Sequence, residues 1–171
     1  SALPTPAGVR RVDVESALEM REAVLGLLPK AHVVIKAAAV ADFRPAAPEA
    51  RKIRKEDLPE GAGIELALVR NPDILAEVCR QKGDRVVVGF AADSHDVIPS
   101  ARRKLARKGC DLMVANDISQ PDSGFDTDQN AVAFVWPGGG VETLPPLPKS
   151  EVAARLLDRV TRAFERHVVA A

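Results

Sequence analysis

Cysteine and aromatic residues are scarce in this sequence. Its 171 residues include two cysteines, one tryptophan, five phenylalanines and no tyrosine. The cysteines, Cys79 and Cys110, lie far apart in the chain and form no CxxC motif. A disulfide scaffold or a structural zinc site needs several cysteines at short spacings, so neither is expected. Two isolated thiols fit a reducing compartment, and we expect a cytoplasmic protein.

The chain also lacks an excess of charge of either sign and a long apolar run. Its 24 lysines and arginines equal its 24 aspartates and glutamates, which argues against a general nucleic-acid-binding surface. No apolar run reaches the roughly 18 residues of a membrane helix. The first residues, SALPTPAGVRRVDV, lack the charged-then-apolar order of a signal peptide. Neither nucleic acid nor a membrane is therefore an expected partner.

Several well-defined motifs are missing as well. The sequence contains no Walker A motif, no GxGxxG, no GxSxG and no HExxH. The lack of a glycine fingerprint disfavours a dehydrogenase-type NAD domain. The three histidines, His32, His95 and His167, are scattered without partner carboxylates, and we assign them no catalytic role.

The residues that are present alternate between strand and helix patterns. Short runs that are apolar on both faces predict buried parallel strands at 32–40, 85–92 and 111–115. Amphipathic or capped segments predict helices at 16–28, 71–81 and 95–108. We expect Ser16 with Glu19 and Asn71 with Pro72 to begin two of these helices, and Gly109 to end the third. The alternation predicts an α/β fold: a Rossmann-like, mostly parallel sheet flanked by helices.

Two excursions interrupt the alternation, and a different pattern follows it. The charged, Pro- and Gly-containing segment 44–63 predicts a mobile flap outside the sheet, and 116–129 predicts a polar loop after the third strand. Loops at the carboxyl ends of parallel strands are where α/β proteins bind ligands. Segments 131–136 and 141–144 flank PGGG and predict a hairpin, and 150–168 predicts a closing helix.

Acidic and basic residues near the predicted strand ends are candidates for ligand binding. Asp42 follows a strand rich in alanine, where a carboxylate can bind a metal-bridged phosphate or simply start a turn. Lys52 and Lys55 lie in the charged excursion, where they would neutralise an anionic ligand or remain solvated. Asn71, Pro72 and Asp73 open a helix whose free amides suit an anion, although such residues also begin ordinary helices.

Two further groups are weaker candidates. Lys104 and Lys108 are four residues apart and share one helical face, with Arg103 and Arg107 beside them. Such a face can grip a polyphosphate, but cations are also favoured near any helix C-terminus. The oxygen-rich loop with Asp126, Asp128 and Asn130 lacks EF-hand spacing, and turn formation explains it better. Residue chemistry alone thus predicts an α/β domain that binds an anionic small molecule.

An ordered set of motifs makes the prediction more specific. AAAVADFRP, KIRK, LVRNPDIL, VGFAAD, ARRKLARKGCDLMVAND and GFDTDQNAV follow one another at compatible spacings. In this order they resemble phosphopantothenoylcysteine synthetase, the ligase domain of bacterial coenzyme A biosynthesis. The resemblance runs from about Leu3 to the final helix. It implies a Rossmann-like fold and a CTP-dependent ligase, although the family also has ATP-using members.

The resemblance implies a two-step reaction. The carboxylate of 4′-phosphopantothenate attacks the α-phosphate of CTP and releases pyrophosphate, and the amine of cysteine then attacks the acyl-cytidylate to give phosphopantothenoylcysteine and CMP. The triphosphate is expected to bring Mg²⁺, and Asp42 would contact CTP or this metal. Lys52 would lie on the flap and stabilise the charged intermediate as the catalytic residue. The nucleotide would also contact Lys36, Ala37, Ala38, Asn71, Pro72, Asp73, Ile74, Leu75, Phe90, Lys104 and Lys108.

The chain departs from the family pattern in two places. Asp93 of VGFAAD stands where the family often has Glu, a conservative difference. Family members also carry an upstream strand and helix with a Ser-Asn-x-Ser-Ser-Gly-Lys type loop, which supplies part of the phosphate site. We therefore expect a single CTP-binding ligase domain over 1–171 that lacks its first strand-helix unit. The alternative is a non-catalytic nucleotide-binding or dimerisation fragment.

The resemblance also implies partners. The family forms homodimers, and the flap would contribute contacts between the two copies. In bacteria the ligase is commonly fused to an upstream FMN-dependent phosphopantothenoylcysteine decarboxylase domain. Nothing in this sequence matches that domain, so FMN is not expected to bind to this chain.

Overall fold

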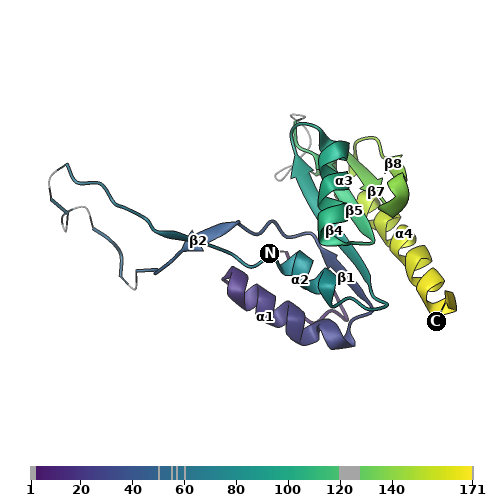
Figure 1. Ribbon diagram of the computed structural model, residues 1–171, viewed down its shortest axis with the longest axis horizontal. Coiled ribbons are helices and arrows are strands. Elements are labelled where there is room, and N and C mark those ends of the chain that lie inside the picture. The colour runs from purple at the N-terminus through teal and green to yellow at the C-terminus, as the bar shows by residue number, and fades with distance from the viewer. Residues whose placement is uncertain are drawn as a thin grey trace. The chain divides into compact units, whose positions relative to one another are not determined.

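The computed structural model describes residues 3–49, 51–54, 56, 58–59, 61–119 and 128–170, the last four of them for the backbone alone. Figure 1 shows the helices and strands in this part of the chain. In chain order they are α1 (Ala17–Leu27), η1 (Leu28–Lys30), β1 (Val33–Lys36), β2 (Phe43–Pro45), β3 (Leu68–Arg70), α2 (Ile74–Arg80), β4 (Val86–Asp93), α3 (Val97–Lys108), β5 (Leu112–Asp117), β6 (Gln129–Asn130), β7 (Val132–Val135), η3 (Pro137–Gly139), β8 (Val141–Thr143), β9 (Leu147–Pro148) and α4 (Lys149–Ala170).

The chain divides into two compact units. Unit 1 comprises 1–23 and 39–73, and unit 2 comprises 24–38 and 74–171. Each unit is therefore made from two separate stretches of sequence, and α1 contributes residues to both.

Unit 2 is built on a five-stranded sheet with the order β1-β4-β5-β7-β8. Strands β1, β4 and β5 are parallel, with Val33 opposite Val86 and Val88 opposite Leu112. Strands β7 and β8 add to the sheet as an antiparallel hairpin next to β5. The three predicted parallel strands and the predicted hairpin are confirmed, and so is the α/β class.

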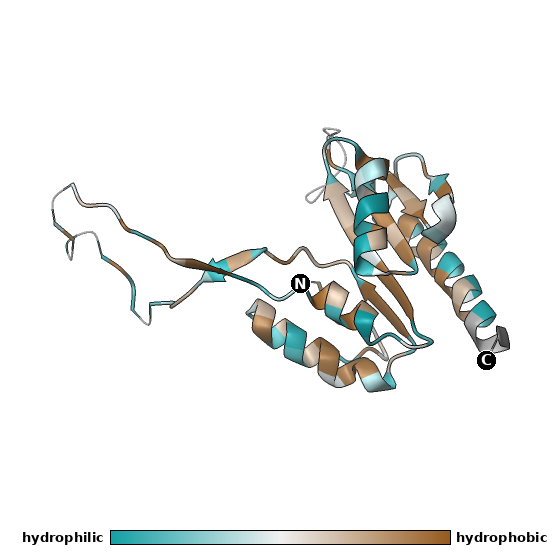
Figure 2. Ribbon diagram, in the orientation of Figure 1, coloured by the Kyte–Doolittle hydropathy of each residue, from teal (hydrophilic) through white to brown (hydrophobic). Residues whose placement is uncertain are grey.

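Alternate residues of the strands face two different helical layers. Figure 2 shows strongly apolar strands in the sheet and helices whose residues alternate between polar and apolar. Val86, Val88, Leu112, Val114, Val132 and Phe134 form one buried cluster with Val152, Leu156 and Val160 of α4. Val152, Leu156 and Val160 thus form the packing face of the closing helix, which was predicted over 150–168.

Helices α2 and α3 cover the other face of the sheet. A Cβ built on Gly89 of β4 would lie 2.6 Å from Leu75 Cδ2 of α2 and 3.1 Å from Met113 Cε of β5. This glycine lets α2 approach the sheet closely. Helix α3 ends as predicted: Gly109 adopts φ 77°, and its amide donates to the carbonyl of Leu105.

Unit 1 contains a two-stranded antiparallel ribbon, β2 with β3, in which Phe43 lies opposite Arg70 and Pro45 opposite Leu68. The residues between these strands form an extended loop in Figure 1, with no strand in its described part. The predicted flap, 44–63, begins within β2 and continues into this loop. At the start of α1, Ser16 Oγ accepts a hydrogen bond from the amide of Glu19 at 3.2 Å, as the predicted cap requires.

No helix in the described ranges combines the length and the apolar character of a membrane span. Helix α4 is long enough, with 22 residues, but it carries charged residues along its whole length.

Candidate functional site

The carboxyl ends of the three parallel strands lie at one edge of the unit 2 sheet. Strand β1 ends at Lys36, β4 at Asp93 and β5 at Asp117, and Asp93 lies directly opposite Asp117 in the register. Ligands of open α/β sheets bind outside this edge. Polar residues that close apolar strands are therefore collected at the position where a ligand is expected.

The segment that follows β1 has small, exposed side chains. Lys36 Nζ donates a hydrogen bond to the carbonyl oxygen of Ala38 at 2.9 Å, so its side chain runs along this turn. Ala37 and Ala38 are exposed. Short side chains let a planar ligand approach the main chain, which agrees with the predicted nucleotide contact without testing it.

A cation of α3 is fixed at the end of β4. Lys104 Nζ lies 2.8 Å from Asp93 Oδ2, and the two side chains retain 32% and 25% of their exposure. A half-buried ion pair keeps the ammonium near the sheet edge but still open to an anion. Lys108 lies one turn further along the same helical face.

The end of β5 carries two further polar groups. Asp117 Oδ1 accepts hydrogen bonds from the amide and hydroxyl of Ser119 at 2.9 and 2.6 Å. The Ser119 hydroxyl and amide hold the pKa of the Asp117 carboxyl below its usual value. Asn116 Oδ1 is buried and has no hydrogen-bond partner among the described residues. A buried acceptor without a donor is costly, so a water molecule or a ligand donor is expected there.

Three of the predicted site residues lie in the apolar core of unit 2 or next to it. Ile74 and Leu75 are only 2% and 7% exposed. Their side chains pack inward, so any contact with a nucleotide would come from their main chain. Phe90 of β4 is half-buried and packs against the cluster below α4.

Asn71 does not cap a helix, contrary to the prediction. Helix α2 begins only at Ile74, so neither Asn71 nor Pro72 belongs to it. The Asn71 amide nitrogen Nδ2 donates to the carbonyl of Ala41 at 2.9 Å, and its backbone N–H donates to the carbonyl of Asp42 at 2.8 Å. Arg44 Nη1 donates to Asn71 Oδ1 at 3.2 Å. Asn71 therefore connects the two strands of the ribbon at one end through its hydrogen bonds.

The hydrogen bond from the Asn71 backbone holds the main chain of Asp42 in place, and the Asp42 side chain is exposed. Pro72 is half-buried and Asp73 is exposed beside it. Lys52 is exposed in the loop between β2 and β3.

Lys55 and Asp126 lie outside the described residues. Asp128 is exposed and its carbonyl accepts the amide of Lys149, which is a turn contact, and Asn130 lies in β6.

The predicted residues thus divide between the units. Within unit 1 the structure joins Asp42 to Asn71, and within unit 2 it fixes Lys104 at the carboxyl edge. Sequence reasoning missed three roles: Asp93 as the partner of Lys104, Arg44 as the partner of Asn71, and Asn116 as an unsatisfied acceptor. For Asp93 and Asn116, a polar residue at the end of an apolar run was the available signal.

The two cysteines, far apart in sequence, are neighbours in the fold. Their sulfur atoms lie 3.4 Å apart, and both are buried free thiols. The hydrogen bond with Cys79 and the loss of solvation raise the pKa of the Cys110 thiol well above its usual value. The Cys110 thiol therefore stays protonated and unreactive as long as this packing persists.

One protein family matches most of the chain. The sequence profile of the family described as "DNA/pantothenate metabolism flavoprotein C-terminal domain" matches residues 1–164. The coenzyme A biosynthesis bifunctional protein CoaBC of Escherichia coli strain K12 is 43% identical over 169 residues, which are 97% of this chain and 41% of that protein. The chain therefore spans less than half the length of this relative.

Solved structures share the fold. The crystal structure of the C-terminal domain of a coenzyme A biosynthesis bifunctional protein CoaBC superposes with a TM-score of 0.77 at 34% identity. The match covers 96% of this chain and 71% of the other. A Cab2 mutant in complex with phosphopantothenate-cysteine has a TM-score of 0.54 at 19% identity, with 78% of this chain and 44% of the other covered. At that identity the likeness concerns the fold alone.

Proposed function

Because the chain belongs to the family of DNA/pantothenate metabolism flavoprotein C-terminal domains, we propose that it acts as a phosphopantothenate–cysteine ligase in coenzyme A biosynthesis. The reaction activates the carboxylate of 4′-phosphopantothenate with CTP and then joins it to the amine of cysteine. The observation that carries the proposal is Lys104, which Asp93 holds at the carboxyl edge of the sheet. A fixed cation at this edge suits the triphosphate of a nucleotide.

The first step needs charge stabilisation more than covalent help from the protein. As the carboxylate of phosphopantothenate attacks the α-phosphate, negative charge grows on the phosphate oxygens and on the departing pyrophosphate. Lys104 and Lys108 of α3 would hold the phosphates, and Lys52 would bring a further ammonium group from the loop. The acyl-cytidylate that forms is a reactive mixed anhydride, so water must be excluded until the amine of cysteine attacks.

Mg²⁺ fits this site as a companion of the nucleotide. Asp42 offers an exposed carboxylate. The described residues contain no cluster of three or more metal-binding side chains. Mg²⁺ usually binds through one or two carboxylates plus substrate phosphates and water, so a single aspartate is a suitable protein ligand. When bound, the ion would neutralise phosphate charge.

A pyrophosphate-release assay tests the proposed function. We expect release from CTP that requires phosphopantothenate but not cysteine, because activation precedes amide formation, and we expect a smaller rate with ATP. Mass spectrometry should then detect phosphopantothenoylcysteine only after cysteine is added. If the chain binds CTP without releasing pyrophosphate, the alternative of a non-catalytic nucleotide-binding fragment is favoured. If neither nucleotide binds, the proposal fails.

We also propose that two copies of the chain associate through the ribbon of unit 1. Phe43 is 51% exposed, and Ile64, Leu66 and Leu68 are 54%, 66% and 57% exposed. The last three occupy alternate positions, which place side chains on one face of an extended segment. A two-stranded ribbon is marginal in water by itself, so an apolar face of this kind favours a homodimer.

The proposal also includes an upstream decarboxylase domain and a cytoplasmic location. The relative from Escherichia coli is named a bifunctional protein, and this chain matches 41% of it. An upstream decarboxylase domain with FMN would supply the second activity, and no FMN would bind to the chain itself. A coenzyme A biosynthetic enzyme of this kind would work in the cytoplasm.

A further inference from the structure

A cavity of about 500 Å³ lies at the opposite end of the unit 2 sheet from the carboxyl edge. Asp111 precedes the first residue of β5, and Trp136 and Pro137 follow the last residue of β7. The wall across from them is α4. Pockets of several hundred cubic ångströms hold small organic ligands in proteins. We call this space the α4 cavity, and no residue of the proposed ligase site lines it.

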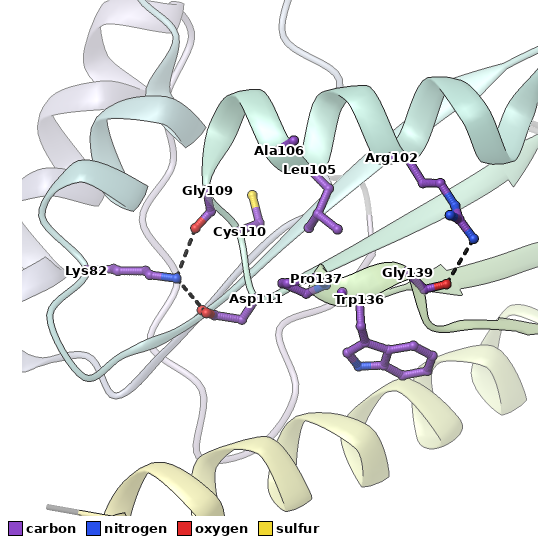
Figure 3. Close-up of a pocket in the computed structure, with 11 residues that line it drawn as sticks. Lys82, Arg102, Leu105, Ala106, Gly109, Cys110, Asp111, Trp136, Pro137 and Gly139 are labelled. Atoms are coloured by element: carbon purple, nitrogen blue, oxygen red, sulfur yellow. Dashed lines mark hydrogen bonds and ion pairs between the residues drawn. The ribbon is translucent and has the colours of Figure 1, made fainter.

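The α4 cavity has one aromatic wall. Residues of β7 alternate between the two faces of the sheet, and Trp136 continues the side of Phe134, which packs under α4. The two rings meet edge to face with their centroids 6.2 Å apart. In Figure 3 the indole of Trp136 extends from the hairpin toward α4 and away from Leu105 of α3. Its half-buried ring and the small side chain of Ala163 offer a flat apolar surface.

The opposite part of the cavity is cationic. Arg159, Arg162 and Arg166 line it from successive turns of α4. Arg159 forms a bidentate pair with Glu142, with distances of 2.8 and 2.7 Å. Arg162 and Arg166 are exposed and make no ion pair with any residue whose side chain the structure describes. Two guanidinium groups one turn apart on the same side of a helix suit a phosphate group, because each offers a planar fork of donors.

The single carboxylate in the lining does not cancel this charge. Asp111 Oδ1 lies 2.5 Å from Lys82 Nζ, and its Oδ2 accepts the backbone N–H of Val87 at 2.8 Å. Both oxygens are therefore occupied, and Lys82 balances the charge; Figure 3 shows this contact beside the hairpin. The cavity thus combines a flat aromatic wall with two guanidinium groups that form no ion pair with the described side chains.

We propose that the α4 cavity is a second ligand site, which binds a small molecule with a planar aromatic base and phosphate groups, of the class of nucleoside diphosphates. The base stacks on Trp136, and the phosphates bind Arg162 and Arg166. Stacking on an aromatic side chain strengthens base binding in nucleic-acid-binding proteins, whatever the base. The site is independent of the proposed ligase function, because none of its residues takes part in that reaction.

Intrinsic fluorescence provides a direct test. Trp136 is the single tryptophan and the chain has no tyrosine, so the emission reports on this cavity. We expect ADP to change the emission in a saturable way and with an affinity at least about tenfold higher than that of inorganic pyrophosphate, which lacks the base. The change should persist in Lys104→Gln, which removes a cation of the proposed ligase site. Loss of the ADP response in this variant, or equal affinities for ADP and pyrophosphate, overturns the proposal.

A pair of double variants tests the cationic part. We expect Arg162→Gln/Arg166→Gln to weaken ADP binding by about tenfold or more, since both phosphate ligands are lost. Arg80→Gln/Arg155→Gln removes the same charge from helices of unit 2 without touching the lining, and it should bind ADP like the wild type. Circular dichroism verifies that both proteins are folded. If the two double variants bind ADP equally well, the assignment of Arg162 and Arg166 is wrong.

Discussion

Lys52 shows how one exposed side chain can matter to the proposed reaction. It lies in the loop between β2 and β3 and is exposed, and the described residues give it no ion-pair partner. An ammonium group without a partner costs little to bring to a phosphate, because no existing contact has to break.

We predict that Lys52→Gln slows CTP-dependent turnover by about 10²–10³-fold and leaves the denaturation midpoint unchanged. The glutamine keeps the length of the side chain but removes the charge that the transition state needs. Steady-state kinetics measured by pyrophosphate release provides the readout. Arg54→Gln, an equal loss of charge two residues away in the same exposed loop, serves as the control and should stay within about twofold of the wild type. Equal slowing of both variants would point to a general charge effect.

Asn71 explains why single residues are harder to predict than segments. Asn before Pro is a common start of a helix, and local chemistry alone could not distinguish that role from another. The actual partners, Ala41 and Arg44, are about 30 residues away and become neighbours only when β2 pairs with β3. The contact Cys79–Cys110 was missed for the same reason, because its residues lie 31 positions apart in the sequence.

At the level of elements, Glu142 and Arg159 connect the hairpin to the closing helix. Glu142 belongs to β8 and Arg159 to α4, and their bidentate contact bridges the two. The Arg159 guanidinium lowers the pKa of the Glu142 carboxyl from its ordinary value of 4.5. A pKa lowered by folding means that the pair contributes stability above pH 4.5 and loses it as the pH falls through the folded-state pKa.

We predict that Glu142→Gln lowers the free energy of unfolding by about 0.5–1 kcal/mol at neutral pH, since the pair is partly solvated. The difference between the variant and the wild type should shrink toward zero as the pH falls below the lowered folded-state pKa, where Glu142 is protonated in both states. Urea denaturation at a series of pH values measures it. Glu165→Gln removes a carboxylate of α4 and should show a smaller difference. If the difference in the free energy of unfolding between Glu142→Gln and the wild type does not depend on pH, the stability does not come from the charge of the Glu142–Arg159 pair.

Long apolar elements were predictable from the sequence, and short polar ones were not. The runs that became β4 and β5 are apolar on both faces, because helices cover both sides of the sheet. The stripe of α4 has helical spacing and lies on the packed face. Strands β2, β3, β6 and β9 have two or three residues each and carry too few side chains for any periodicity to appear. Long-range pairing alone defines them.

On the scale of the whole molecule, the proposed dimer interface on the ribbon of unit 1 can be tested through the oligomeric state. We predict that Leu66→Glu converts a dimer into a monomer, because a buried unpaired carboxylate opposes association. Sedimentation equilibrium at several concentrations gives the mass. Ala67→Glu adds the same charge at the neighbouring position, which faces the other side of an extended segment, and should leave the dimer intact. An unchanged mass for Leu66→Glu, or a wild type that is monomeric at every concentration, refutes the proposed interface.

The two units are interleaved along the chain, and this has a practical consequence. The chain passes from one unit to the other after residues 23, 38 and 73. If a protease cuts the loop between β2 and β3, the N-terminal fragment keeps β1 and the C-terminal fragment keeps β4. Since β1 and β4 pair in register from Val33 with Val86 to Lys36 with Gly89, the halves remain joined without a peptide bond. The chain is therefore a natural candidate for a split protein, whose two separately expressed pieces reassemble by completing one sheet.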